Sequence, residues 1–246
     1  MEPINKFGSL GPSRFLNYNN PISIITSNRD GFELTCLQAF NLYGKRIKTI
    51  NNSDKRTYSM AIYTNNQNEN KKCFIIVGYD HFIISYDYNK NQVYKMYHDL
   101  NDKYNGSHLS IIVQDNQQMT KLIESSLDGN IRVWNFNSGE LINKIKIDNE
   151  SIYGICSINN GNLIIGCDNG QIKLVSVNKG DIQCFKNKFS KSITTVKTIR
   201  NNFEEILIAQ SFGEGMINFY KLCYWTLLYI KFISIINNAS FFDKIP

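Results

Sequence analysis

Residues 125–136 of this chain have the sequence SSLDGNIRVWNF, and this stretch decides the fold class. The Asp-Gly pair at 128–129 is a strong hairpin signal, because both residues tolerate the positive φ angles of a tight turn. After the turn, IRVWNF places β-branched or aromatic residues at period two, which is the pattern of a β-strand. The stretch therefore predicts two antiparallel strands joined by a short turn.

The same combination of alternation and turns recurs along the chain. Strand periodicity is clear in FIISYDY at 82–88 and in QIKLVSV at 171–177. Further turn signals are NRDG at 28–31, INNGN at 158–162 and CDNG at 167–170. Apolar alternation dominates over helical spacing, so the sequence predicts an antiparallel, all-β protein.

An internal repeat organises these strands. Residues 109–147 predict four strands, and comparable units precede and follow them. Aligning the third strand of each unit places at one position Cys36, Tyr86, Trp134, Val175 and Tyr220, separated by 50, 48, 41 and 45 residues, with the Cys36 register uncertain by one residue. Blades of a β-propeller have four strands and about 40 to 45 residues. One blade cannot bury its own sheet, so we expect neighbouring units to pack face to face.

These features resemble the WD-repeat β-propeller family over roughly residues 20–235, with the best match at 108–147. In that family a turn Asp, a third-strand Trp, a second-strand Ser or Thr and a His before the first strand form a buried hydrogen-bonded set. The resemblance implies a structural fastening of this blade by His108, Ser126, Asp128 and Trp134. Asn135 stands where the family prefers Asp.

The other units keep the turn and lose most of this set. Their turn position holds Asp30, Asp80, Asn169 and Glu214, which can all support a turn. Trp is replaced by Cys, Tyr or Val, so we expect a complete set only in the unit at 109–147.

The number of blades stays open. Five units are visible, whereas most WD-repeat propellers have seven. The chain is either an incomplete or divergent seven-bladed propeller, or a closed five-bladed one in which SIINNASFF at 234–242 supplies the fourth strand of the first unit. We assign residues 1–20 to an N-terminal lead-in, residues 21–236 to the WD-repeat-like propeller and residues 237–246 to a C-terminal tail or closing strand. Whether the chain is a fragment also stays open.

Charge, cysteines and apolar runs constrain the class of partner and the compartment. The 27 Lys and Arg form no block of five or more, so the net charge of +6 predicts solvated strand faces and no nucleic-acid footprint. Six cysteines without a C-x-x-C pair, and three distant histidines, predict buried reduced thiols and no zinc site. We therefore expect a cytoplasmic protein, with a nuclear location left open.

The 15-residue apolar run at 222–236 is interrupted by Lys231 and is too short to span a bilayer, so it predicts a buried strand pair.

The sequence contains no recognisable catalytic, nucleotide or metal motif, and Asp80 beside His81 is interpreted as a turn. We expect a non-catalytic scaffold or adaptor that binds other proteins, with no cofactor, metal or small-molecule substrate. Two alternatives stay open: a substrate receptor of a ubiquitin ligase-type complex, and an RNA- or ribonucleoprotein-associated propeller. The RNA alternative predicts one shared face for Arg46, Lys48, Lys144, Lys146, Lys188 and Lys191. The sequence does not identify the partner or the pathway.

Overall fold

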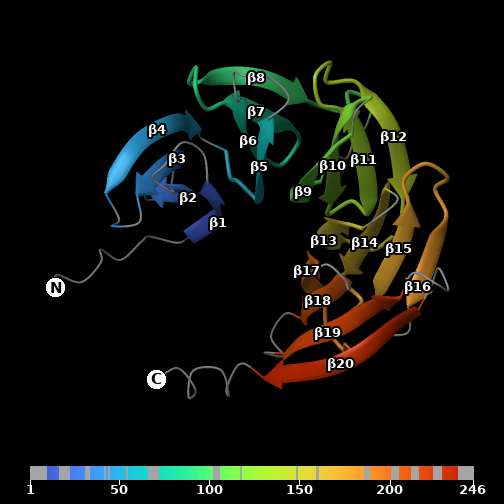
Figure 1. Cartoon of the computed structure of the whole chain (residues 1–246). Helices are drawn as coiled ribbons and strands as arrows, with labels where there is room; N and C mark the ends of the chain where they lie inside the picture. The colour runs from blue at the N-terminus through green and yellow to red at the C-terminus, as the bar shows by residue number, and fades with distance from the viewer. Residues whose placement is uncertain are drawn as a thin grey trace. The chain divides into compact units, whose positions relative to one another are not determined.

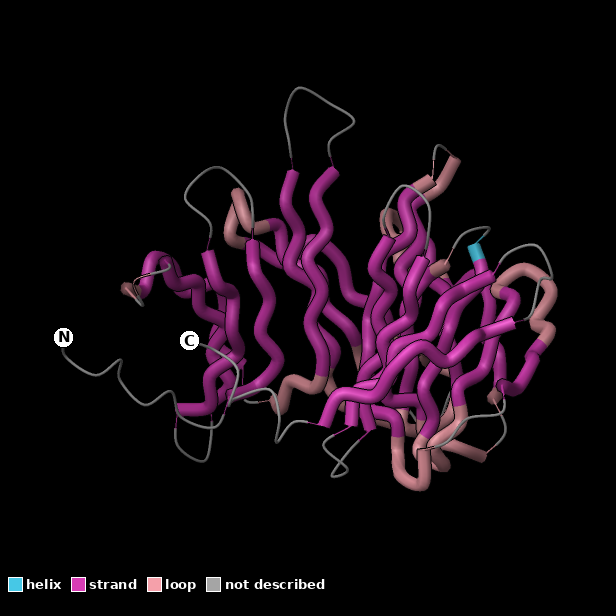
Figure 2. Tube along the Cα trace, turned by 60° about the horizontal axis from the view of Figure 1, so that its bottom comes forward, coloured by secondary structure: helices cyan, strands magenta, loops and turns pink. Residues whose placement is uncertain are grey.

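The structure is a computed structural model. It describes residues 10–16, 23–30, 34–41, 43, 45–53, 55–65, 72–101, 106–116, 118–147, 149–158, 161–185, 189–200, 205–211, 216–223 and 229–237. Within these ranges the chain consists almost entirely of β-strands and the turns between them (Figure 2). The all-β prediction is confirmed.

The described strands form five four-stranded sheets, each built from four consecutive strands (Figure 1). The first sheet contains β1 (Leu10–Leu16), β2 (Ser23–Asp30), β3 (Leu34–Asn41) and β4 (Arg46–Ser53). The second contains β5 (Ser59–Asn65), β6 (Lys72–Gly78), β7 (Ile83–Asp87) and β8 (Gln92–Tyr97). The third contains β9 (His108–Asp115), β10 (Thr120–Ser126), β11 (Asn130–Asn135) and β12 (Leu141–Lys146). The fourth contains β13 (Ile152–Ser157), β14 (Asn162–Cys167), β15 (Ile172–Ser176) and β16 (Ile182–Phe185). The fifth contains β17 (Ile193–Arg200), β18 (Glu205–Ser211), β19 (Met216–Cys223) and β20 (Tyr229–Asn237).

The first sheet takes its fourth strand from the N-terminal segment. Strand β1 pairs antiparallel with β2, with Leu16 opposite Ser23. This strand lies inside residues 1–20, which the sequence analysis assigned to a lead-in, and its sequence LGPSRFL contains too little alternation to be recognised. Strand β20, which contains the start of the candidate closing segment, pairs with β19 instead. Residues 238–246 lie outside the described residues.

Each of the five residues aligned at the third-strand position lies in the third strand of its sheet. In three sheets this residue lies opposite an aliphatic residue of the preceding strand: Tyr86 opposite Ile75, Val175 opposite Leu163, and Tyr220 opposite Leu207. Cys36 lies opposite Asn28. The apolar run at 222–236 forms parts of β19 and β20, which pair antiparallel, while residues 224–228 and Glu214 lie outside the described residues.

The chain divides into two compact units. The first consists of residues up to Leu122 together with Trp134–Ile142, and the second consists of Ile123–Val133 and the residues from Asn143 onward. The boundary therefore passes through the third sheet. In the first unit, β6 of the second sheet is buried on both faces, from its second residue to its last. Its sequence KCFIIVG is a continuous apolar run, as expected for a strand covered on both sides.

Alternate side chains of β6 contribute to two separate apolar clusters. Cys73, Ile75 and Val77 belong to a cluster with first-sheet residues such as Leu37. Phe74 and Ile76 belong to a second cluster, which also contains Tyr97, Leu122, Trp134 and Phe136.

In the second unit, an apolar cluster joins the fourth and fifth sheets. It contains Cys156, Ile164, Val196 and Leu207. Gly166 of β14 allows the close approach, because a Cβ at this position would lie 2.6 Å from Cγ2 of Ile193. The second unit therefore packs its sheets through small residues on β14 and branched residues on β17.

Candidate functional site

The turn between β10 and β11 is held by several hydrogen bonds, and Asp128 organises it. Its Oδ1 accepts a hydrogen bond from the backbone N of Asn130 at 2.9 Å, and its Oδ2 accepts one from Nδ2 of Asn130 at 2.9 Å. Gly129 adopts a φ of 75°, and its N–H donates to the backbone oxygen of Ser126 at 3.1 Å. The carboxylate thus fixes a backbone shape that requires glycine.

Arg132 joins this turn to the interior of the sheet. Its NH2 group forms an ion pair with Oδ2 of Asp128, and its NH1 group forms one with Oε1 of Glu124 at 3.1 Å. The side chains of Arg132 and Glu124 are both 0% exposed. A buried charge is tolerated when it is paired, so the two carboxylates compensate the charge of the guanidinium that lies between them.

The pKa of Asp128 responds to two opposing effects. Burial disfavours the charged carboxylate and acts to raise the pKa, but the hydrogen bonds from Arg132 and Asn130 outweigh it. The pKa is therefore lowered below its ordinary value of 3.8, and Asp128 is ionised at neutral pH.

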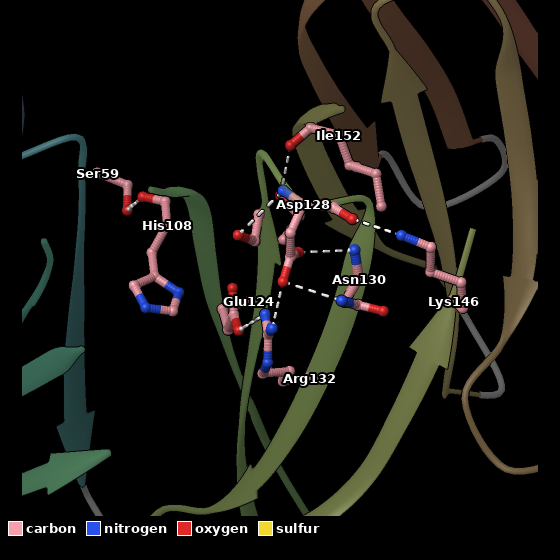
Figure 3. Close-up of polar contacts among 10 residues, drawn as sticks. Ser59, His108, Glu124, Asp128, Asn130, Arg132, Lys146 and Ile152 are labelled. Carbon is pink, nitrogen blue, oxygen red and sulfur yellow. Dashed lines mark hydrogen bonds and ion pairs between the residues drawn. The ribbon is translucent and has the colours of Figure 1, made fainter. Parts of the chain in front are cut away.

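Three further contacts support the same turn from neighbouring segments of the second unit, and Figure 3 shows the first of them, from Lys146. Nζ of Lys146 donates to the backbone oxygen of Asp128 at 2.6 Å. Oγ of Ser151 donates to the backbone oxygen of Leu127 at 3.1 Å. The backbone N of Ile147 donates to the backbone oxygen of Gly129 at 2.8 Å. The side chain of Leu127 nevertheless stays 47% exposed. The turn is thus a rigid support for one exposed apolar side chain.

The fourth sheet repeats part of this arrangement. Lys173 occupies the position two residues before Val175, as Arg132 does before Trp134. Its buried Nζ lies 3.0 Å from Oε2 of Glu150, whose side chain is 24% exposed. A buried cation on the third strand is therefore common to both repeats.

The predicted fastening residues are described one by one. Trp134 is buried, and its ring lies edge-on to Tyr97 at 6.2 Å between centroids. Its Nε1 has no hydrogen-bond partner among the described residues, so packing holds this side chain and the predicted indole hydrogen bond is absent there. The buried His108 donates through its backbone N to the oxygen of Tyr79 and accepts through its own oxygen from Oγ of Ser59.

Ser126 and Asp128 belong to the second unit, whereas His108 and Trp134 belong to the first. Oγ of Ser126 accepts from the backbone N of Asp128 at 3.5 Å, a long contact. The partners that sequence reasoning missed are Glu124 and Arg132. Their signal was available, because a charged residue at an inward position of LIESS and IRVW is unusual unless it is paired.

The described residues show no group of three or more His, Cys, Asp and Glu that could hold a metal ion. In the same ranges, no helix is long and apolar enough to cross a membrane. Of the cations considered for an RNA-binding face, Arg46 and Lys48 lie on β4 in the first unit, while Lys144 and Lys146 lie on β12 in the second. Lys188 lies outside the described residues.

Comparison with known proteins identifies the fold class. No protein-family model matches the chain, and no curated protein matches it. The structure is similar to the crystal structure of the computationally designed Ika8 protein, with a TM-score of 0.61, 14% identity, and coverage of 86% of this chain and 58% of Ika8. It is also similar to the designed Ika4 protein, with a TM-score of 0.53, 15% identity, and coverage of 70% of this chain and 94% of Ika4.

Both solved structures are designed β-propellers. This chain spans less than two thirds of the length of Ika8. At such low identity the likeness concerns the fold alone. The chain is a β-propeller protein built from four-stranded antiparallel blades.

Proposed function

We propose that the chain is a non-catalytic scaffold that binds other proteins through blades of the WD-repeat type. The observation that carries this proposal is Leu127, a large apolar side chain that is 47% exposed on a turn fixed by hydrogen bonds. The hairpin around Asp128 and the buried Trp134 support the assignment of this blade to the WD-repeat type.

The chemistry of the polar groups also favours a structural role. Arg132 is turned toward Glu124 and Asp128, and Lys173 toward Glu150. Groups that are paired with one another stabilise the fold and have less capacity left for a reacting substrate. The same groups hold the backbone under Leu127 in one conformation.

A rigid exposed side chain is well suited to be an interface anchor. Complete burial of a Leu side chain is worth about 1.5–3 kcal/mol, and part of that is available at Leu127. Little conformational entropy is lost on binding, because the turn is already ordered. Interfaces concentrate their binding energy in a few such central residues.

We also propose an intracellular, cytoplasmic location. Cys73, Cys156 and Cys167 are buried as free thiols, which suits a reducing compartment.

The test is affinity capture of tagged full-length protein from cells, with quantitative mass spectrometry. Leu127→Asp should reduce the recovery of specific partners about fivefold or more, because a charge at an interface anchor must be desolvated. Leu100→Asp is the matched control, since Leu100 is even more exposed but lies in a different turn. Equal recovery for both variants, or the absence of any specific partner, would contradict the proposal.

A further inference from the structure

The positive charge of the chain is concentrated in one region. Residues 45–97 contain nine Lys and Arg and four Asp and Glu, a net charge of +5, while the whole chain carries +6. This region includes β4 of the first sheet and all of the second sheet, within the first unit. The Lys and Arg form no continuous block, but their excess over Asp and Glu is local.

The described acidic side chains of this region are already engaged. Asp87 is buried, and its Oδ1 accepts hydrogen bonds from the backbone N atoms of Asn89 and Lys90 at 3.0 Å. Asp80 accepts a hydrogen bond from Oγ of Ser107 at 2.9 Å. The exposed cations of the region are Lys45, Arg46, Lys55, Arg56, Lys72 and Lys90. The surface of these two sheets is therefore electropositive.

Apolar side chains are exposed beside some of these cations. Strand β8 is the last strand of its sheet, and its Val93 and Met96 are 53% and 52% exposed. On β4, Ile47 is 50% exposed. Nζ of Lys48 donates to the backbone oxygen of Tyr88 and lies 4.4 Å from the centroid of its ring, which brings β4 beside the turn that leads into β8. We call Arg46, Ile47, Lys90, Val93 and Met96 the β4–β8 surface.

The backbone of β8 is held in place. Oη of Tyr94 donates to Oδ1 of Asn137 at 3.1 Å, and its ring lies 4.7 Å from that of Phe74. The β7–β8 pairing shifts register between Ser85 and Tyr86, and such a bulge disfavours the addition of another strand at the edge. A ligand would therefore contact the side chains of β8 and would not extend its sheet.

The side chains distinguish between two anionic ligands. A single-stranded nucleic acid needs open aromatic faces for base stacking. Within residues 45–97, the rings of Tyr88, Phe82 and Tyr58 each already carry a cation, at 4.4, 5.6 and 5.0 Å from the ring centroid. The 95% exposed Tyr43 is an open ring, but it lies outside this region, before β4. The exposed aliphatic side chains of Val93 and Met96 suit the apolar residues of a polypeptide instead.

We propose that the β4–β8 surface docks an extended acidic segment of a partner protein. Its carboxylates face Arg46 and Lys90, and its apolar side chains cover Val93 and Met96. The inference rests on the proposed scaffold function and specifies the chemistry of one partner.

The test uses fluorescence anisotropy with a labelled twelve-residue peptide that alternates Glu and Val. Matched peptides carry Gln or Lys in place of Glu, and twelve-nucleotide oligouridylate represents nucleic acid. The Glu peptide should bind about tenfold more tightly than the Gln peptide, and its binding should weaken with rising salt. The double variant Arg46→Glu, Lys90→Glu should bind the Glu peptide about tenfold more weakly. The double variant Val93→Ser, Met96→Ser should bind the Glu peptide about fivefold more weakly.

The matched control is Lys179→Glu with Lys191→Glu, which changes the net charge equally at exposed positions of the second unit. The affinity of this control for the Glu peptide should lie within about twofold of that of the unchanged protein. An equal loss in the control, equal binding of the Gln peptide, no binding of the Glu peptide, or displacement of it by oligouridylate would each overturn the proposal. Circular dichroism of every variant confirms folding. Because the scaffold proposal is tested by the Leu127 capture experiment, either proposal can fail while the other stands.

Discussion

Replacing Arg132 with Met is expected to destabilise the protein strongly, because it removes the cation that neutralises two carboxylates. Glu124 is 0% exposed, and Arg132 NH1 lies 3.1 Å from its Oε1. Removing one partner of a buried pair typically costs about 3–5 kcal/mol, since the remaining charge stays buried. For a chain of this size each kcal/mol lowers Tm by roughly 2–4 °C, so the expected decrease is about 6–20 °C.

Two further variants separate the buried charge from the loss of packing. Glu124→Leu combined with Arg132→Met removes both charges, and this double variant should be more stable than Arg132→Met alone. Lys173→Met is the matched control at the equivalent repeat position. Its partner Glu150 is 24% exposed and can be hydrated after the substitution, so this variant should lose less stability.

The measurement is thermal unfolding of the full chain, followed by circular dichroism in the far ultraviolet. A loss below about 1 kcal/mol for Arg132→Met, or simple additivity in the double variant, would refute the reasoning. The first result would mean that water reaches Glu124, and the second that the two groups do not interact.

Three other predictions concern the packing of Trp134, the charge of Asp128 and the reactivity of the cysteines. Trp134→Ala should cost roughly 3–5 kcal/mol, because the ring is buried in an apolar cluster, and a negligible change in urea-induced unfolding would contradict this packing. The pKa of Asp128 is lower in the folded protein than its unfolded value of 3.8. The ionised carboxylate therefore stabilises the fold above about pH 3.8, and this stabilisation is lost as the pH falls through the lower folded pKa. An acid titration of Asp128→Asn should therefore show a weaker loss of stability below about pH 4, and an unchanged slope would exclude this contribution. Burial raises the pKa of the Cys73 and Cys167 thiols to about 12, so iodoacetamide at pH 8 should label the exposed Cys184 before these two, as mass spectrometry can show.

Local sequence patterns were sufficient to predict the strands of the middle units. In the unit at 109–147, the Asp-Gly turn and the alternation after it depend on neighbouring residues only. Strand β1 was missed because its LGPSRFL sequence, with Gly11 and Pro12, has little strand character. Its pairing with β2 decides its conformation, and pairing partners are not encoded in a local pattern.

The candidate site was only partly predictable. The structure places Asp128 in a turn, and the family pattern gave no indication that its carboxylate pairs with Arg132. Period-two alternation put Arg132 and Trp134 on the same side of the strand, and it gave no information about which side chain Asp128 would reach. That choice depends on the turn geometry and on the competition between nearby donors.

The sequence by itself determined the β-strands, the hairpin turns and the four-strand repeat, because these follow from side-chain alternation and from backbone preferences of Asp, Asn and Gly. Tertiary structure alone decided that Glu124 and Arg132 are buried together and that Leu127 is exposed on a fixed turn. It also decided that Lys48 covers Tyr88, which brings β4 beside the turn that leads into β8. The physical reason is that burial, charge pairing and surface clustering depend on contacts between strands that are distant in sequence, and one-dimensional periodicity contains no such distances.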